Sequence, residues 1–69
     1  MRAYVIVSRN KADLHDACYS AKMGGLVSAW GEPRDVSDSR FAVTVMVRGN
    51  AQDFKDYIKD AWAYSIRVM

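Results

Sequence analysis

The chain matches itself when its sequence is shifted by 40 positions, and this internal repeat limits the folds that it can adopt. The identical pairs are Val5 and Val45, Val7 and Val47, Asn10 and Asn50, Asp13 and Asp53, Asp16 and Asp56, and Ala21 and Ala61. Two further pairs, Leu14 with Phe54 and Cys18 with Ile58, are apolar in both copies. A repeat of this kind predicts one supersecondary unit that occurs twice.

Each copy has the pattern of a β-strand that leads into a capped helix. Asparagine is favoured at helix N-caps, and an aspartate three residues later meets the positive end of the helix dipole. Asn10 and Asn50 are both followed by an aspartate at this spacing. Apolar residues then recur at i, i+3, i+4 and i+7, which predicts a helix buried on one side. These residues are Leu14, Ala17, Cys18 and Ala21 in the first copy, and Phe54, Tyr57, Ile58 and Ala61 in the second.

Four segments have the alternation or the β-branched content of strands. They are residues 3–8, 26–30, 41–48 and 65–69. Gly24 and Gly25 end the first helix, and turn-forming residues fill 31–35 and 37–39. Two β-α-β units predict an α+β, ferredoxin-like β-α-β-β-α-β two-layer sandwich. We expect residues 1–69 to form this single domain, with a four-stranded antiparallel sheet and two helices on one face.

The composition agrees with a small globular domain and places its positive charge on the sheet. A chain of 69 residues with 51% hydrophobic and 26% charged residues excludes disorder and leaves no room for a second domain. Every lysine falls in a predicted helix among acidic residues, whereas every arginine falls in a strand or loop. Arginine offers planar, bidentate donors, so the sheet and its loops favour an acidic partner. The alternative is that the arginines only keep the surface soluble.

The two sides of the predicted sheet are both apolar. The helices are expected to cover the side that carries Val5, Val7, Phe41, Val43, Val45, Val47, Ile66 and Val68. A strand that is apolar on both sides is normally buried on both sides, so we expect a second copy or another molecule to cover the open side. The alternative is a few tolerated exposed apolar residues. The candidate binding residues are Tyr4, Ile6, Met46, Arg48, Arg67 and Trp30, and the pattern leaves open which side Trp30 takes.

No residue pattern indicates catalysis or a metal site. His15 and Cys18 lie three residues apart on the first predicted helix, but a metal site needs three or four ligands and the chain has no other histidine or cysteine. A single cysteine excludes an intrachain disulfide and indicates a reducing, cytoplasmic environment. No apolar run reaches the ~18 residues of a membrane span. We therefore expect no metal, no cofactor and no membrane partner.

This sequence lacks the signature residues of several families that share the ferredoxin-like fold. An acylphosphatase-like loop would need glycines, but the first strand and helix are joined by Ser8, Arg9 and Asn10. Metal-carrying domains need two cysteines in that loop, and ligand-sensing domains of the ACT type usually have a glycine after the first strand. An RNA-recognition motif needs aromatic residues where this sequence has Thr44 and Met46.

The function expected from these features is that of a small non-enzymatic interaction protein. Through its open sheet face and arginine rim it would bind another protein, or a second copy as a homodimer. Single domains of this size are often accessory regulators or inhibitors, including those that phages and mobile elements encode. One alternative is nucleic-acid binding, with Tyr4, Trp30 or Trp62 as stacking partners. Another is a small ligand-sensing domain or enzyme whose pocket forms between two subunits.

Overall fold

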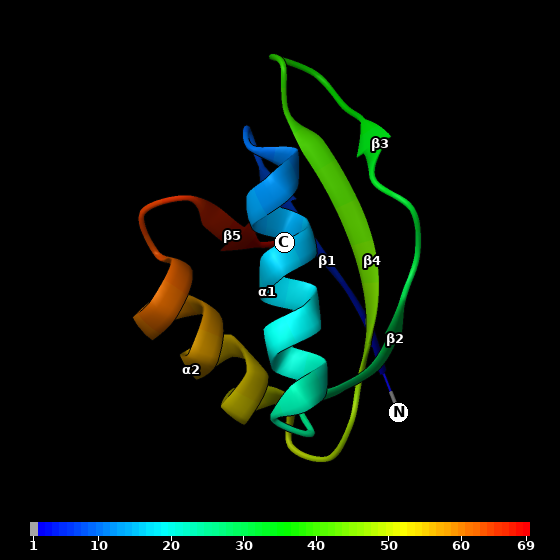
Figure 1. The fold of residues 1–69 in the computed structure, drawn as a ribbon, viewed down its shortest axis with the longest axis vertical. Coiled ribbons are helices and arrows are strands. Elements are labelled where there is room, and N and C mark those ends of the chain that lie inside the picture. Colours follow the sequence, from blue (N-terminus) through cyan, green and yellow to red (C-terminus); the bar gives the residue numbers. More distant parts are fainter. Residues whose placement is uncertain (1) are drawn as a thin grey trace.

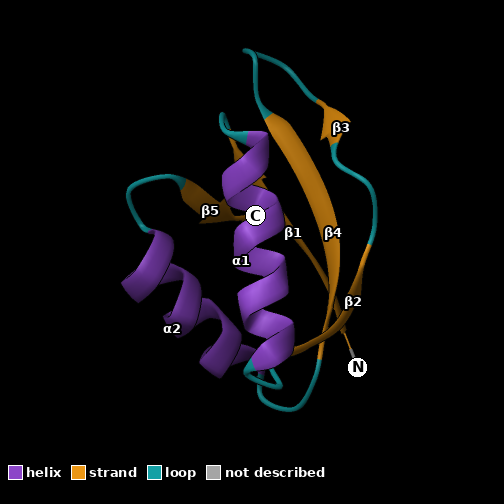
Figure 2. Ribbon diagram, in the orientation of Figure 1, coloured by secondary structure: helices purple, strands orange, loops and turns teal. Residues whose placement is uncertain are grey.

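An antiparallel sheet is covered on one side by two helices in the computed structural model, which describes residues 2–69 (Figure 1). The elements in chain order are β1 (Arg2–Ser8), α1 (Lys11–Met23), β2 (Val27–Trp30), β3 (Arg34–Asp35), β4 (Phe41–Val47), α2 (Ala51–Trp62) and β5 (Ile66–Val68). The strand order is β2-β4-β1-β5, and β3 pairs with β4 off this path. Figure 2 shows both helices on the same side of the sheet. The expected α+β class is confirmed.

The sheet has five strands, so the predicted number of four is wrong. Residues 34–35, which the sequence assigns to a loop, form β3 and pair with the start of β4. The polar segment between these strands is a tight turn in which Asp38 and Ser39 have φ angles of 61° and 59°. The amide of Val36 donates to the carbonyl oxygen of Arg40 across this turn (2.9 Å). Left-handed φ at both central residues is what a type I′ hairpin turn requires, and this turn brings β3 back onto β4.

The core lies between the sheet and the helices, and the pairing of β1 with β4 determines its sheet side. Tyr4 lies opposite Val45, and Ile6 lies opposite Val43, with all four side chains directed toward the helices. The buried core consists of Ile6, Leu14, Ala17, Cys18, Ala21, Val27, Val43, Val45, Val47, Phe54, Ile58 and Ile66. The predicted apolar stripe of α1 is fully buried. In α2, Phe54 and Ile58 are buried, whereas Ala61 at the end of the predicted stripe is exposed.

Both predicted helix starts are confirmed. The Oδ1 atom of Asn10 accepts hydrogen bonds from the amides of Ala12 (3.0 Å) and Asp13 (3.3 Å). The Oδ1 atom of Asn50 accepts a hydrogen bond from the amide of Gln52 (2.8 Å). These amides have no acceptor within their own helix, so the two asparagine side chains stabilise the first turns.

The strands of the two repeat copies are not equivalent, although their helices are. The last inward-facing residue of β1, Ser8, is two residues ahead of Asn10, whereas Val47 is three residues ahead of Asn50. Gly49 takes up the additional residue with a φ of 61°, a conformation that glycine adopts without strain. The 40-residue shift therefore aligns the helices but places β1 one residue out of phase with β4.

Replacing Asn50 by alanine should lower the free energy of unfolding by about 1 kcal/mol, because the Gln52 amide loses its acceptor. Asn50→Asp keeps a side-chain acceptor at the same place and should stay close to the wild type. Urea unfolding followed by circular dichroism measures both. Equal losses in the two variants would show that the side chain of residue 50 does not act as a cap.

Val45 and Val5 form a matched pair that tests the register of β1 against β4. Val45 is fully buried in the core, whereas Val5 is only half-buried on the opposite side of the sheet. Val45→Ala should lower the free energy of unfolding by about 2 kcal/mol through lost burial and a residual cavity. Val5→Ala should cost clearly less in the same urea titration. A larger loss for Val5→Ala would contradict the observed register.

Candidate functional site

The side of the sheet without helices presents an apolar centre that β1 and β4 form together. The cross-strand pairs on this side are Ala3 with Met46, Val5 with Thr44, and Val7 with Ala42. We call these six residues the open face. Val5, Val7 and Met46 are half-buried, so part of each side chain is accessible to a partner. A solvated side of an antiparallel sheet is normally polar, and this apolar centre therefore marks a candidate binding surface.

Tyr4 and Ile6, which the sequence places on the open side, lie on the helix side instead. Ile6 is 0% exposed, and Nζ of Lys55 in α2 lies 5.2 Å from the centroid of the Tyr4 ring. The prediction is wrong because it places the valines of β1 on the same side as those of β4, whereas Val45 and Val43 lie opposite Tyr4 and Ile6. Side chains alternate between faces, so an error of one residue exchanges the two faces of a strand. Val5 and Val7 take the places that were expected for Tyr4 and Ile6.

The remaining candidate residues divide between the two sides. Met46 belongs to the open face, and Arg67 of β5 faces the same way, as its pairing with β1 shows. Arg48 is exposed and directly follows β4. Trp30 packs against the core from the helix side, where Nζ of Lys22 lies 5.8 Å from its ring centroid. The structure thus brings Met46 and Arg67 to one side, and their role in binding stays a prediction.

An arginine lies over the open face, whereas three lysines lie over aromatic rings on the helix side. Arg34 of β3 pairs with Ala42, and its Nη1 atom donates to Oγ1 of Thr44 (3.2 Å), so this guanidinium lies over the open face. No residue of the open face is acidic. On the helix side, lysine ammonium groups lie over aromatic rings: Lys11 over Phe41, Lys22 over Trp30 and Lys55 over Tyr4. The open face is therefore flanked by arginine, while three lysines are engaged elsewhere.

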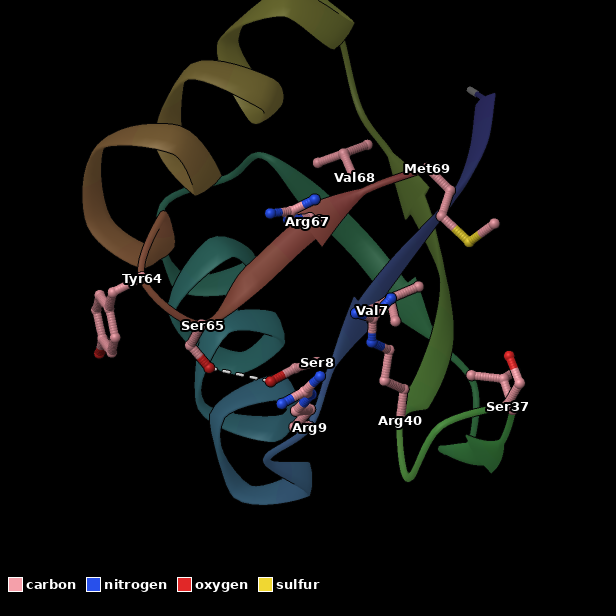
Figure 3. A pocket seen from close by; sticks show the side chains of 11 residues that line it. Val7, Ser8, Arg9, Ser37, Arg40, Tyr64, Ser65, Arg67, Val68 and Met69 are labelled. Carbon is pink, nitrogen blue, oxygen red and sulfur yellow. Dashed lines mark hydrogen bonds between the residues drawn. The ribbon is translucent and has the colours of Figure 1, made fainter.

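A pocket of about 640 Å³ opens where β1 and β5 meet the turn between β3 and β4 (Figure 3). Three arginines line it: Arg9 follows β1, Arg40 precedes β4, and Arg67 lies in β5. We call this hollow the arginine pocket. Its other lining residues are Val7, Ser8, Val36, Ser37, Tyr64, Ser65, Val68 and Met69, so none of the residues lining it is acidic. Within residues 2–69, the three guanidinium groups have no hydrogen-bond or ion-pair partner.

A chain of hydrogen bonds holds the floor of the arginine pocket. The hydroxyl of Ser65 donates to Oδ2 of Asp13 (2.6 Å), because the carboxylate can only accept. The contact between the Ser8 and Ser65 hydroxyls (3.0 Å) must then have Ser8 as its donor. The Ser8 oxygen in turn accepts from the amide of Asn10 (3.0 Å). These bonds join the end of β1 to the start of α1 and to the segment that enters β5.

The potential metal ligands and the single cysteine were the other candidates for chemistry in the sequence. Among residues 2–69, no group of three or more potential metal ligands lies together. Cys18 is buried in the core, and desolvation raises the pKa of its thiol from 9.0 to about 11, which disfavours the nucleophilic thiolate. Neither described helix is long and apolar enough to cross a membrane.

The Cys18 thiol should therefore resist alkylation in the folded protein. At pH 8, iodoacetamide should label native Cys18 far more slowly than urea-unfolded protein, as intact mass measures. Because the folded-state pKa lies above the unfolded value, stability from the neutral thiol is complete below pH 9.0 and is lost as the pH rises toward about 11. Rapid labelling of the native protein at pH 8 would contradict the burial of Cys18.

Reasoning from the sequence identifies Arg67 but misses Arg9 and Arg40. The loop with Arg9 lacks the glycines that a ring of backbone amides needs, but a guanidinium side chain binds an anion without them. Arg40 carries no local signal, because the pairing of Phe41 with Ser8 brings it beside Arg9 only in the folded chain. Comparisons with protein-family models, curated proteins and solved structures find no match for this chain. The open face and the arginine pocket are therefore the two candidate binding surfaces of the chain.

Proposed function

We propose that the chain is a small binding domain, without catalytic activity of its own, that holds an acidic partner protein on its open face. The observation that carries this proposal is the accessible apolar centre, with Val5, Val7 and Met46, beside Arg34 and Arg67. An apolar centre with arginine around it is typical of protein–protein interfaces. An acidic partner surface would complement the charge of the arginine side chains beside the open face.

Two other occupants of the open face are less well supported. Single-stranded nucleic acid needs aromatic side chains on which bases stack, but Tyr4 and Trp30 lie on the helix side of the sheet. A second copy of the chain would bring its own arginines to a face without an acidic residue. The lack of stacking aromatics therefore disfavours nucleic acid, and the arginines beside the open face disfavour a second copy, which leaves an acidic protein as the better-supported occupant.

We also infer a more specific fold and role. The succession of elements supports a ferredoxin-like sandwich to which β3 has been added at the edge of β4. A domain this small that binds through one face suits an accessory regulator or inhibitor, whose effect comes from covering part of its partner.

Charge reversal on the open face should weaken partner binding. The protein is immobilised, partners are captured from extract of the source cells, and the captured protein is purified and titrated by calorimetry. Arg34→Glu should reduce affinity about tenfold or more by opposing an acidic surface. Met46→Glu should also weaken binding by placing a charge in the apolar centre. The purified partner should carry an acidic surface.

Lys59→Glu is the matched control, since Lys59 is an exposed cation on α2, away from the open face. It should leave the affinity unchanged, and circular dichroism verifies that all variants fold. Loss of binding in Lys59→Glu with retention in Arg34→Glu would place the binding surface on the helices. A stable dimer on size exclusion, or a salt-dependent shift with single-stranded DNA in place of protein binding, would overturn the proposal in favour of the other occupants.

A further inference from the structure

We infer that the arginine pocket binds the phosphate group of a small phosphate monoester that carries an apolar group. Its three guanidinium groups come from positions far apart in the sequence, Arg9, Arg40 and Arg67. Like charges around one hollow repel one another, and no side chain that lines it is a counter-ion, so the hollow favours a bound anion. The Asp13 carboxylate below it is engaged by the Ser65 hydroxyl. Figure 3 shows the three side chains around Val7 and the Ser8–Ser65 hydrogen bond.

The number of donors favours phosphate over carboxylate. A phosphate monoester carries a charge of about −1.5 to −2 at pH 7 and has three terminal acceptor oxygens. Each guanidinium presents its N–H donors in a planar fork that matches such oxygens in pairs. A carboxylate offers two oxygens and a single charge, so it matches fewer of the donors around the pocket. Three arginines therefore match the charge and the oxygen count of phosphate better.

The size and the walls of the pocket predict that the phosphate carries an organic group. A volume of about 640 Å³ lies in the range of small-molecule sites and far exceeds a single phosphate ion. Val36, Val68 and Met69 form apolar parts of the lining. Tyr64 also lines the pocket, but its ring is 79% exposed, stacks against Trp62 with centroids 6.1 Å apart and points away from the three arginines in Figure 3. The three apolar side chains therefore favour an apolar group beside the phosphate.

The residues varied to test the arginine pocket differ from those varied to test the proposed function. Arg9 and Arg40 lie outside the open face, whereas Arg34 and Met46 do not line the pocket. Only Val7 and Arg67 connect the two surfaces. A failure of partner binding would therefore leave the arginine pocket intact, and the reverse also holds.

Calorimetric titration with phenyl phosphate as the probe tests the inference. We expect saturable binding of one molecule per chain, weakened about tenfold in Arg9→Gln and in Arg40→Gln through loss of charge-assisted hydrogen bonds. Arg48→Gln removes the same charge from an exposed position outside the pocket and should leave the dissociation constant unchanged.

Two comparison ligands, benzoate and inorganic phosphate, distinguish the chemical classes of ligand that the pocket could bind. Benzoate, which has the ring but a carboxylate in place of the phosphate, should bind more weakly than phenyl phosphate. Equal binding of benzoate would overturn the phosphate assignment, and equal binding of inorganic phosphate would overturn the apolar part. The absence of saturable binding, or an equal loss in Arg48→Gln, would show that the pocket is not a site and that any attraction comes from general positive charge. Thermal unfolding of each variant verifies that it is folded.

Discussion

The antiparallel pairing of β1 with β4, from Arg2 opposite Val47 to Ser8 opposite Phe41, determines what each side of the molecule presents. Because side chains alternate along a strand, this register directs Ile6 into the core and leaves Val5 for the open face. The helices pack where the register places the larger apolar surface. The candidate binding surface and the core thus lie on opposite sides of the same two strands, and one set of backbone hydrogen bonds determines both.

Polar contacts rather than apolar packing position the arginine pocket. Ser8 is buried at the point where β1 leaves the sheet, and its hydroxyl bonds to Ser65, which donates to Asp13. Arg9 directly follows Ser8, and Arg67 is two residues beyond Ser65, so the same contacts fix the backbone beside two of the three arginines. A buried hydroxyl without such partners would be costly. The bonds that satisfy these serines therefore also define the geometry of the pocket.

Features that depend on neighbouring residues could be predicted from the sequence, and features that depend on distant pairing could not. The caps Asn10 and Asn50 and the α1 stripe are local, and the structure confirms them. The face of β1 depends on β4, because Val5, Ile6 and Val7 are all apolar and their pattern fits either side. A two-residue strand such as β3 has no periodicity to detect. The arginine pocket joins residues 9, 40 and 67, which meet only in the folded chain.

The one-residue offset between the repeat copies makes them unable to exchange places during folding. If the second copy took the position of the first, Arg48 would occupy the site of Ser8, which is only 3% exposed. An arginine buried there without a partner would be strongly unfavourable. In the reverse exchange, Arg9 would have to adopt the left-handed conformation of Gly49. The two similar segments therefore do not compete for the same position. The native state is separated in free energy from the alternative in which the two copies are exchanged.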